Sequence, residues 1–100
     1  MSSERRQISR RPTEFLLNAV ENGIPVLCLA RDISPNGARL ERLGSRSAIQ
    51  SHSMRLEFKL PGMKRVLHTH AQCVRREGAG RTIGVKFTSL SEADRALLRL

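Results

Sequence analysis

The sequence has few aromatic residues: its 100 residues include three Phe and neither Trp nor Tyr. A chain of this length forms one domain, and its core must be built mainly from Leu, Val, Ile, Ala and Met. Proteins that bind single-stranded nucleic acid usually stack the bases on aromatic side chains. The shortage of aromatic residues therefore disfavours that class.

Cysteines are few and long apolar runs are absent. The two cysteines, Cys28 and Cys73, are fewer than a small secreted domain usually carries as disulfide staples. No segment has the length of a membrane-spanning helix, and the charged N-terminus is not followed by the apolar core of a signal peptide. We therefore expect a cytoplasmic protein with reduced thiols and no membrane insertion.

Acidic residues are also scarce, with two Asp in the chain, Asp32 and Asp94. The spacing suggests no Ser-His-Asp or Cys-His arrangement, and no glycine-rich phosphate loop precedes a helix. We therefore expect neither an enzyme nor a bound cofactor.

His68, His70 and Cys73 are close in sequence and could suggest a metal site. Along a strand, successive side chains point to opposite faces, so His68 and His70 share a face while Cys73 points to the other. Three ligands that do not converge cannot hold a zinc ion. We expect no metal here, but two surface histidines and a core thiol.

Positive charge is abundant. The formal net charge is +9, and 15 of the 18 basic residues are Arg. Such a charge favours an anionic partner, and the planar guanidinium grips phosphate with two parallel hydrogen bonds and stacks on flat rings. A genome rich in G and C would explain scattered arginines, but it does not explain the cluster of Arg5, Arg6, Arg10 and Arg11.

The hydrophobic pattern is mainly that of strands. Residues 1–12 are polar, basic and without periodicity, which predicts a mobile arm. Residues 54–60 alternate apolar and charged side chains, as a half-buried strand does. A helix is predicted over about 91–100, with Ser91 as its N-cap. Residues 13–20 are predicted as strand or helix. The remaining predicted strands are 25–31, 38–43, 66–76 and 82–88. The sum predicts a small antiparallel barrel or sandwich.

Two short motifs carry the chemistry. Arg6 and Arg10 are four residues apart in the basic arm, and Asp32, Ser34 and Gly37 form an Asp-x-Ser-x-x-Gly turn between two strands. Alone, the first could be a solvated charge run. The Asp and Ser of the second could simply bond their own backbone. Their joint presence in this order is more specific than either one.

Together the two motifs resemble those of the PilZ domain family. Gly-Val-Lys-Phe at 84–87 is similar to that family's Gly-Val-x-Phe strand, and residues 91–98 are similar to its closing helix. The resemblance extends from Arg5 to the end of the chain. It implies a mainly β fold, a six-stranded antiparallel barrel over 13–100 that follows the arm 1–12 and ends in a C-terminal α-helix.

The resemblance also implies a ligand, since PilZ domains are receptors for cyclic di-GMP. Arg6 and Arg10 would hold guanine and phosphate, Asp32 and Ser34 would meet the ligand on the barrel surface, and Gly37 would permit the tight turn. The chemistry agrees, because the O6 and N7 acceptors of guanine match an Arg fork. Its Watson–Crick edge presents adjacent donors that suit a carboxylate.

Arg5 bears on how many ligands bind. In the family, an Arg directly before the Arg-x-x-x-Arg motif favours a stacked pair of cyclic di-GMP molecules, so we expect two per protomer. Arg39, two residues after Gly37, is predicted to face outward, where it would touch either a phosphate or nothing.

With no second domain, the protein is expected to act as an adaptor that presents a ligand-dependent surface to an effector protein. The sequence does not identify that partner. Two alternatives stay open: a PilZ-like module that works through protein contacts without ligand, and a basic nucleic-acid-binding barrel.

Overall fold

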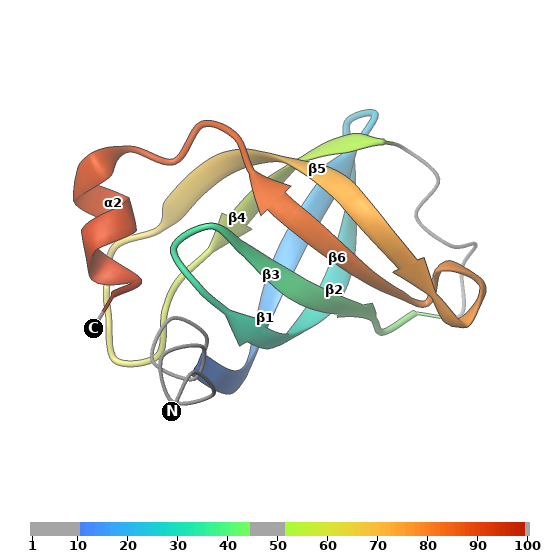
Figure 1. The fold of residues 1–100 in the computed structure, drawn as a ribbon, viewed down its shortest axis with the longest axis horizontal. Coiled ribbons are helices and arrows are strands. Elements are labelled where there is room, and N and C mark those ends of the chain that lie inside the picture. The colour runs from blue at the N-terminus through green and yellow to red at the C-terminus, as the bar shows by residue number, and fades with distance from the viewer. Residues whose placement is uncertain (1–10, 45–51, 100) are drawn as a thin grey trace, which may run out of the picture.

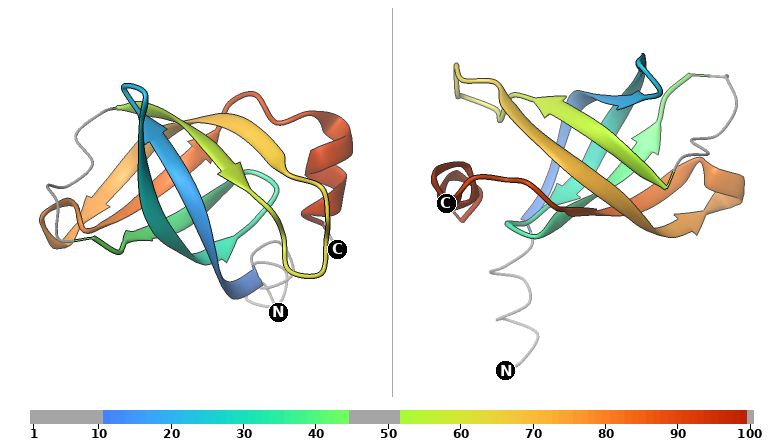
Figure 2. Two further views of the ribbon diagram at one scale, coloured as in Figure 1. Left: turned by 180° about the vertical axis from the view of Figure 1, so that it is seen from behind. Right: turned by 90° about the horizontal axis from the view of Figure 1, so that it is seen from above.

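The computed structural model describes residues 11–44 and 52–99 of the chain. Six antiparallel strands close into a barrel in the order β1-β2-β3-β6-β5-β4, and a short helix follows the last strand (Figures 1 and 2). The predicted six-stranded antiparallel barrel is thereby confirmed. The elements are β1 (Arg11–Glu21), β2 (Ile24–Ile33), β3 (Gly37–Arg42), β4 (Ser53–Phe58), β5 (Leu67–Glu77), the 3-10 turn η1 (Gly78–Gly80), β6 (Thr82–Phe87) and α2 (Glu92–Leu97).

The first strand is longer than predicted. The sequence left residues 13–20 open between strand and helix, and they are strand. β1 begins at Arg11, so two residues assigned to the arm, Arg11 and Pro12, pair with β2 instead. The hairpin turn at Asn22 and Gly23 has φ of 55° and 78°, the left-handed conformation that Asn-Gly supplies in two-residue hairpins.

The barrel interior is filled by the apolar side of each strand. Leu40, Leu56, Leu67 and Ile83 are almost completely buried and come from four different strands. Phe58 lies at the centre of the aromatic contacts, with ring centroids 5.9 Å from Phe15 and 6.3 Å from Phe87. Phe58 and Phe87 are both buried, so both rings belong to the core.

The C-terminal helix is shorter than predicted. Its N-cap is Ser91, as expected: the Ser91 hydroxyl accepts a hydrogen bond of 3.1 Å from the backbone N–H of Asp94. The α-helix covers six residues, not 91–100, because its end tightens into i→i+3 hydrogen bonds from Leu98 to Arg95 and from Arg99 to Ala96. Leu98 is buried against the core. No helix in the described parts of the chain is both long and apolar enough to cross a membrane.

Candidate functional site

The pairing of β1 with β2 brings the residues that follow the arginine motif beside the Asp-x-Ser-x-x-Gly turn. Arg11 pairs with Ile33 and Pro12 pairs with Asp32, so the strand that continues the basic arm runs beside the Asp-x-Ser-x-x-Gly turn. Arg11 follows the arginine motif directly in sequence. The predicted ligand residues of the arm, Arg5, Arg6 and Arg10, lie outside the described residues.

Ser34 holds the turn in shape. Its backbone N–H donates to the Gly37 carbonyl at 2.8 Å, and its hydroxyl accepts from the N–H groups of Asn36 at 3.2 Å and Gly37 at 3.3 Å. The residue is 8% exposed. Short Ser side chains stabilise turns by this kind of local bond. Ser34 therefore rigidifies the turn from Asp32 to Gly37.

Position 37 requires a glycine because the backbone there lies directly against β6. It begins β3 opposite Lys86, and the adjoining Phe87 N–H donates to the Asn36 carbonyl at 2.8 Å. A Cβ at this position would lie 2.1 Å from the carbonyl oxygen of Val85. The predicted reason was a tight turn, but the close approach of two strands gives a stronger reason, and no local pattern reveals it.

Asp32 reaches the outer surface through an irregularity in β2. Ala30 is buried, so strict alternation would also turn Asp32 toward the core. The register of β2 against β3 shifts between these two residues, as at a β-bulge, and Ile33 becomes the buried one. Asp32 consequently faces outward, half-buried, beside its cross-strand partner Arg39.

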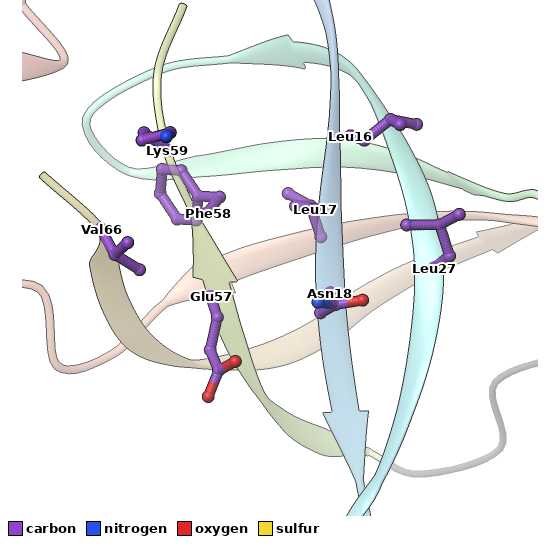
Figure 3. Close-up of a pocket in the computed structure, with 8 residues that line it drawn as sticks. All are labelled: Leu16, Leu17, Asn18, Leu27, Glu57, Phe58, Lys59 and Val66. Carbon is purple, nitrogen blue, oxygen red and sulfur yellow. The ribbon is translucent and has the colours of Figure 1, made fainter. Parts of the chain in front are cut away.

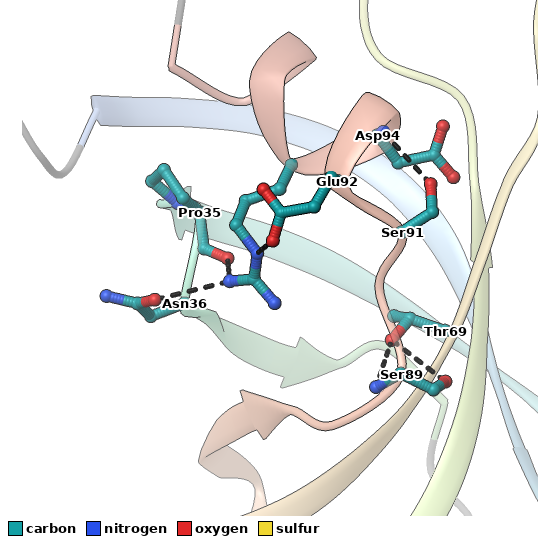
Figure 4. Close-up of polar contacts among 8 residues, drawn as sticks. Pro35, Asn36, Thr69, Ser89, Ser91, Glu92 and Asp94 are labelled. Carbon is teal, nitrogen blue, oxygen red and sulfur yellow. Dashed lines mark hydrogen bonds and ion pairs between the residues drawn. The ribbon is translucent and has the colours of Figure 1, made fainter.

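The motif turn is fastened to the C-terminal helix. The Nη1 of Arg95 donates to the Pro35 carbonyl at 2.6 Å and to Asn36 Oδ1 at 3.3 Å (Figure 4). The helix is held from its other side by an ion pair between Asp94 and Arg65, which lies in the β4–β5 connection. A conformational change of the turn would therefore alter the contacts of α2.

His68, His70 and Cys73 occupy the positions expected of them. His68 and His70 are exposed on β5, while Cys73 of the same strand is buried. No group of three His, Cys, Asp or Glu residues in 11–44 and 52–99 is arranged to hold a metal ion. Burial raises the pKa of the Cys28 thiol to about 11, an effect partly offset by the positive charge of Arg42. Cys28 is thus an inert core thiol.

A separate hollow of about 280 Å3 lies on the outer face of β1, β2 and β4 (Figure 3). Leu16, Leu27 and Val66 on its rim are about half exposed. Its lining includes one acidic and one basic residue, so it offers little to a phosphate-bearing ligand. The lining residues are Leu16, Leu17, Asn18, Leu27, Glu57, Phe58, Lys59 and Val66.

Comparison with known proteins gives a family and a fold. Residues 4–100 match the family model described as PilZ domain. The solved structure of the Bacillus subtilis inhibitor of motility (MotI/DgrA) superposes with a TM-score of 0.73 at 20% sequence identity. The match covers 90% of this chain and 46% of that one, so the chain spans about half of the length of that structure. No curated protein matches the sequence.

Proposed function

Because the chain belongs to the PilZ domain family, we propose that it is a receptor for cyclic di-GMP. The observation that carries the proposal is the β1–β2 register, which sets the start of β1, directly after the arginine motif in sequence, beside the Asp-x-Ser-x-x-Gly turn. Arg11 lies opposite Ile33 and Pro12 opposite Asp32. The residue that follows the arginine motif in sequence thus lies at the same edge of the barrel as the turn.

Each residue has a distinct role in this proposal. Arg6 and Arg10 bind the O6 and N7 acceptors of guanine and the phosphate oxygens, which match the guanidinium fork. The outward carboxylate of Asp32 accepts from the donors on the Watson–Crick edge. Ser34 and Gly37 act indirectly, since the hydroxyl of Ser34 holds the turn and Gly37 lets it lie against β6. The protein would therefore act in the cytoplasm, where it meets the messenger.

Arg5 adds charge next to the arginine motif and favours two ligands per protomer. Each cyclic di-GMP carries two phosphodiester charges, so a stacked pair brings four negative charges to a small area. A chain with a formal net charge of +9 can accommodate them. The stoichiometry of binding tests this part of the proposal.

The contact between Arg95 and the motif turn supports an adaptor role. A ligand that engages Asp32 acts on the same turn that presents Pro35 and Asn36 to Arg95. Rearrangement of the turn would change how α2 sits on the barrel and alter the surface offered to an effector protein. For such a switch, cyclic di-GMP must bind one arrangement of the turn more tightly than the other.

Isothermal titration calorimetry with cyclic di-GMP tests the receptor proposal. We expect saturable binding by the wild type, with a stoichiometry near two, and at least ten-fold weaker binding by Arg6→Ala and Asp32→Ala, because each loses a charge-assisted contact. Arg99→Ala removes an exposed charge at the chain end and serves as the matched control. Absence of binding by the wild type, or equal losses in all three variants, would overturn the proposal.

A further inference from the structure

A row of four residues crosses the strands on the outer surface of the barrel. Of the four, only Asp32 is one of the predicted ligand residues. Cross-strand pairing joins Asp32 of β2 to Arg39 of β3, Arg39 to Gly84 of β6, and Gly84 to Arg75 of β5. These four strands are neighbours in the barrel (Figure 1). The row therefore starts at the candidate ligand carboxylate on β2 and runs away from β1.

Gly84 leaves a hollow between the two arginines. The hollow has a volume of about 200 Å3 and is lined by Ala38, Arg39, Val74, Arg75, Gly84 and Val85. Neighbouring strands lie about 4.8 Å apart, so the Arg39 and Arg75 backbones are roughly 10 Å apart across the glycine. Two long guanidinium side chains thus border a gap that Gly84, which has no side chain, leaves open.

Neither Arg39 nor Arg75 makes a strong hydrogen bond or ion pair with a described residue. Arg39 is exposed, and the structure shows no hydrogen bond or ion pair from its side chain to any described residue. Arg75 has a side chain that is 72% exposed, and its ion pair with Glu77 is long, at 3.8 Å. An exposed pair of this kind contributes little. Both side chains can therefore turn toward a ligand at small cost.

A bulge-like register shift places Arg75 on this surface. Ala71 and Cys73 are buried, so strict alternation would turn Arg75 inward. The register of β5 against β6 shifts between Cys73 and Arg75, so Arg75 joins Val74, which is 64% exposed, on the outer surface beside the hollow. Asp32 owes its outward direction to a similar shift in β2. Bulges that re-aim side chains are frequent next to functional sites.

We propose that Arg39 and Arg75 form a subsite for the guanylate half of cyclic di-GMP that lies beyond Asp32. This inference rests on the proposed receptor function and extends its site across β3, β6 and β5. The hollow is smaller than the roughly 300–1,000 Å3 of pockets that enclose a whole drug-sized ligand, so it suits one part of the molecule. Guanidinium forks bind the phosphodiester or the guanine acceptors, and the exposed Val74 packs on the face of the base.

The test is the affinity for cyclic di-GMP, measured by calorimetry, of Arg39→Ala, Arg75→Ala and the double variant. Each single loss of a charge-assisted contact should raise Kd about ten-fold. Arg75→Lys keeps the charge but loses the fork, and it should also weaken binding. Arg55→Ala is the control, because it removes another exposed arginine, from β4, and should change Kd less than two-fold.

The outcomes separate this subsite from the receptor function as a whole. Wild-type binding that weakens in the Arg39 and Arg75 variants but not in Arg55→Ala supports the subsite. If the wild type binds and the double variant has the same Kd, the subsite alone is overturned. Absence of binding by the wild type overturns both proposals. Because Arg39 and Arg75 are exposed, their variants should keep the wild-type far-UV circular dichroism.

Discussion

Replacement of Gly37 by Ala should destabilise the barrel although it adds only one methyl group. The new Cβ would lie 2.1 Å from the Val85 carbonyl oxygen, more than 1 Å inside ordinary contact, and the obstacle is backbone that cannot rotate away. β3 must then separate from β6, which strains the hydrogen bond from the Phe87 N–H to the Asn36 carbonyl. Overpacking of about 1–3 kcal/mol and a weakened hydrogen bond of about 1 kcal/mol predict a loss of about 2–4 kcal/mol.

Gly84→Ala provides the matched control. Gly84 lies on the strand that β3 contacts, but a Cβ there would meet its nearest neighbour, the Cβ of Arg75, at an ordinary 3.5 Å. Urea unfolding followed by circular dichroism should give Gly84→Ala a free energy of unfolding within about 1 kcal/mol of the wild type. A Gly37→Ala variant as stable as Gly84→Ala would refute the argument from close approach.

Three further changes test the contacts around the site and the core. Arg95→Ala should lower the free energy of unfolding by about 1–2 kcal/mol and shift the amide resonance of Asn36, because its bonds to Pro35 and Asn36 are lost; unchanged spectra would show that the link does not form in solution. Ser91→Ala should cost about 1 kcal/mol in urea unfolding, while Ser91→Asp should keep the N-cap. The pKa of Cys28 is raised by burial from 9.0 to about 11, so the unfolded thiol ionises first. Stability should therefore fall between pH 9 and 11, and it should fall less in Cys28→Ala.

Local pattern is sufficient for much of the fold. The alternation around Met54, Leu56 and Phe58 identifies a half-buried strand, and all three side chains are buried. Ser91 marks the start of the helix because its hydroxyl can cap the first turn. These features depend on residues a few positions apart, so the sequence displays them directly.

The features that shape the site depend on register between distant strands. Strict alternation fails at Asp32 and at Arg75, where register shifts turn each side chain outward. The need for glycine at position 37 arises from a strand nearly fifty residues further along the chain. Arg95 meets a turn that is 60 residues away in sequence. A single sequence shows which side chains are available, but closure of the barrel decides which of them meet.

The most direct test of the central claim is a two-dimensional 1H–15N NMR titration of the wild-type protein with cyclic di-GMP. If the ligand binds where β1 begins beside the motif turn, amide resonances in residues 32–37 and at Arg11 should shift most. Changes should follow in α2 through Arg95, while Leu16 and Leu27 around the apolar hollow should stay unchanged. Spectra without shifts, or with the largest shifts around Leu16 and Leu27, would contradict the claim.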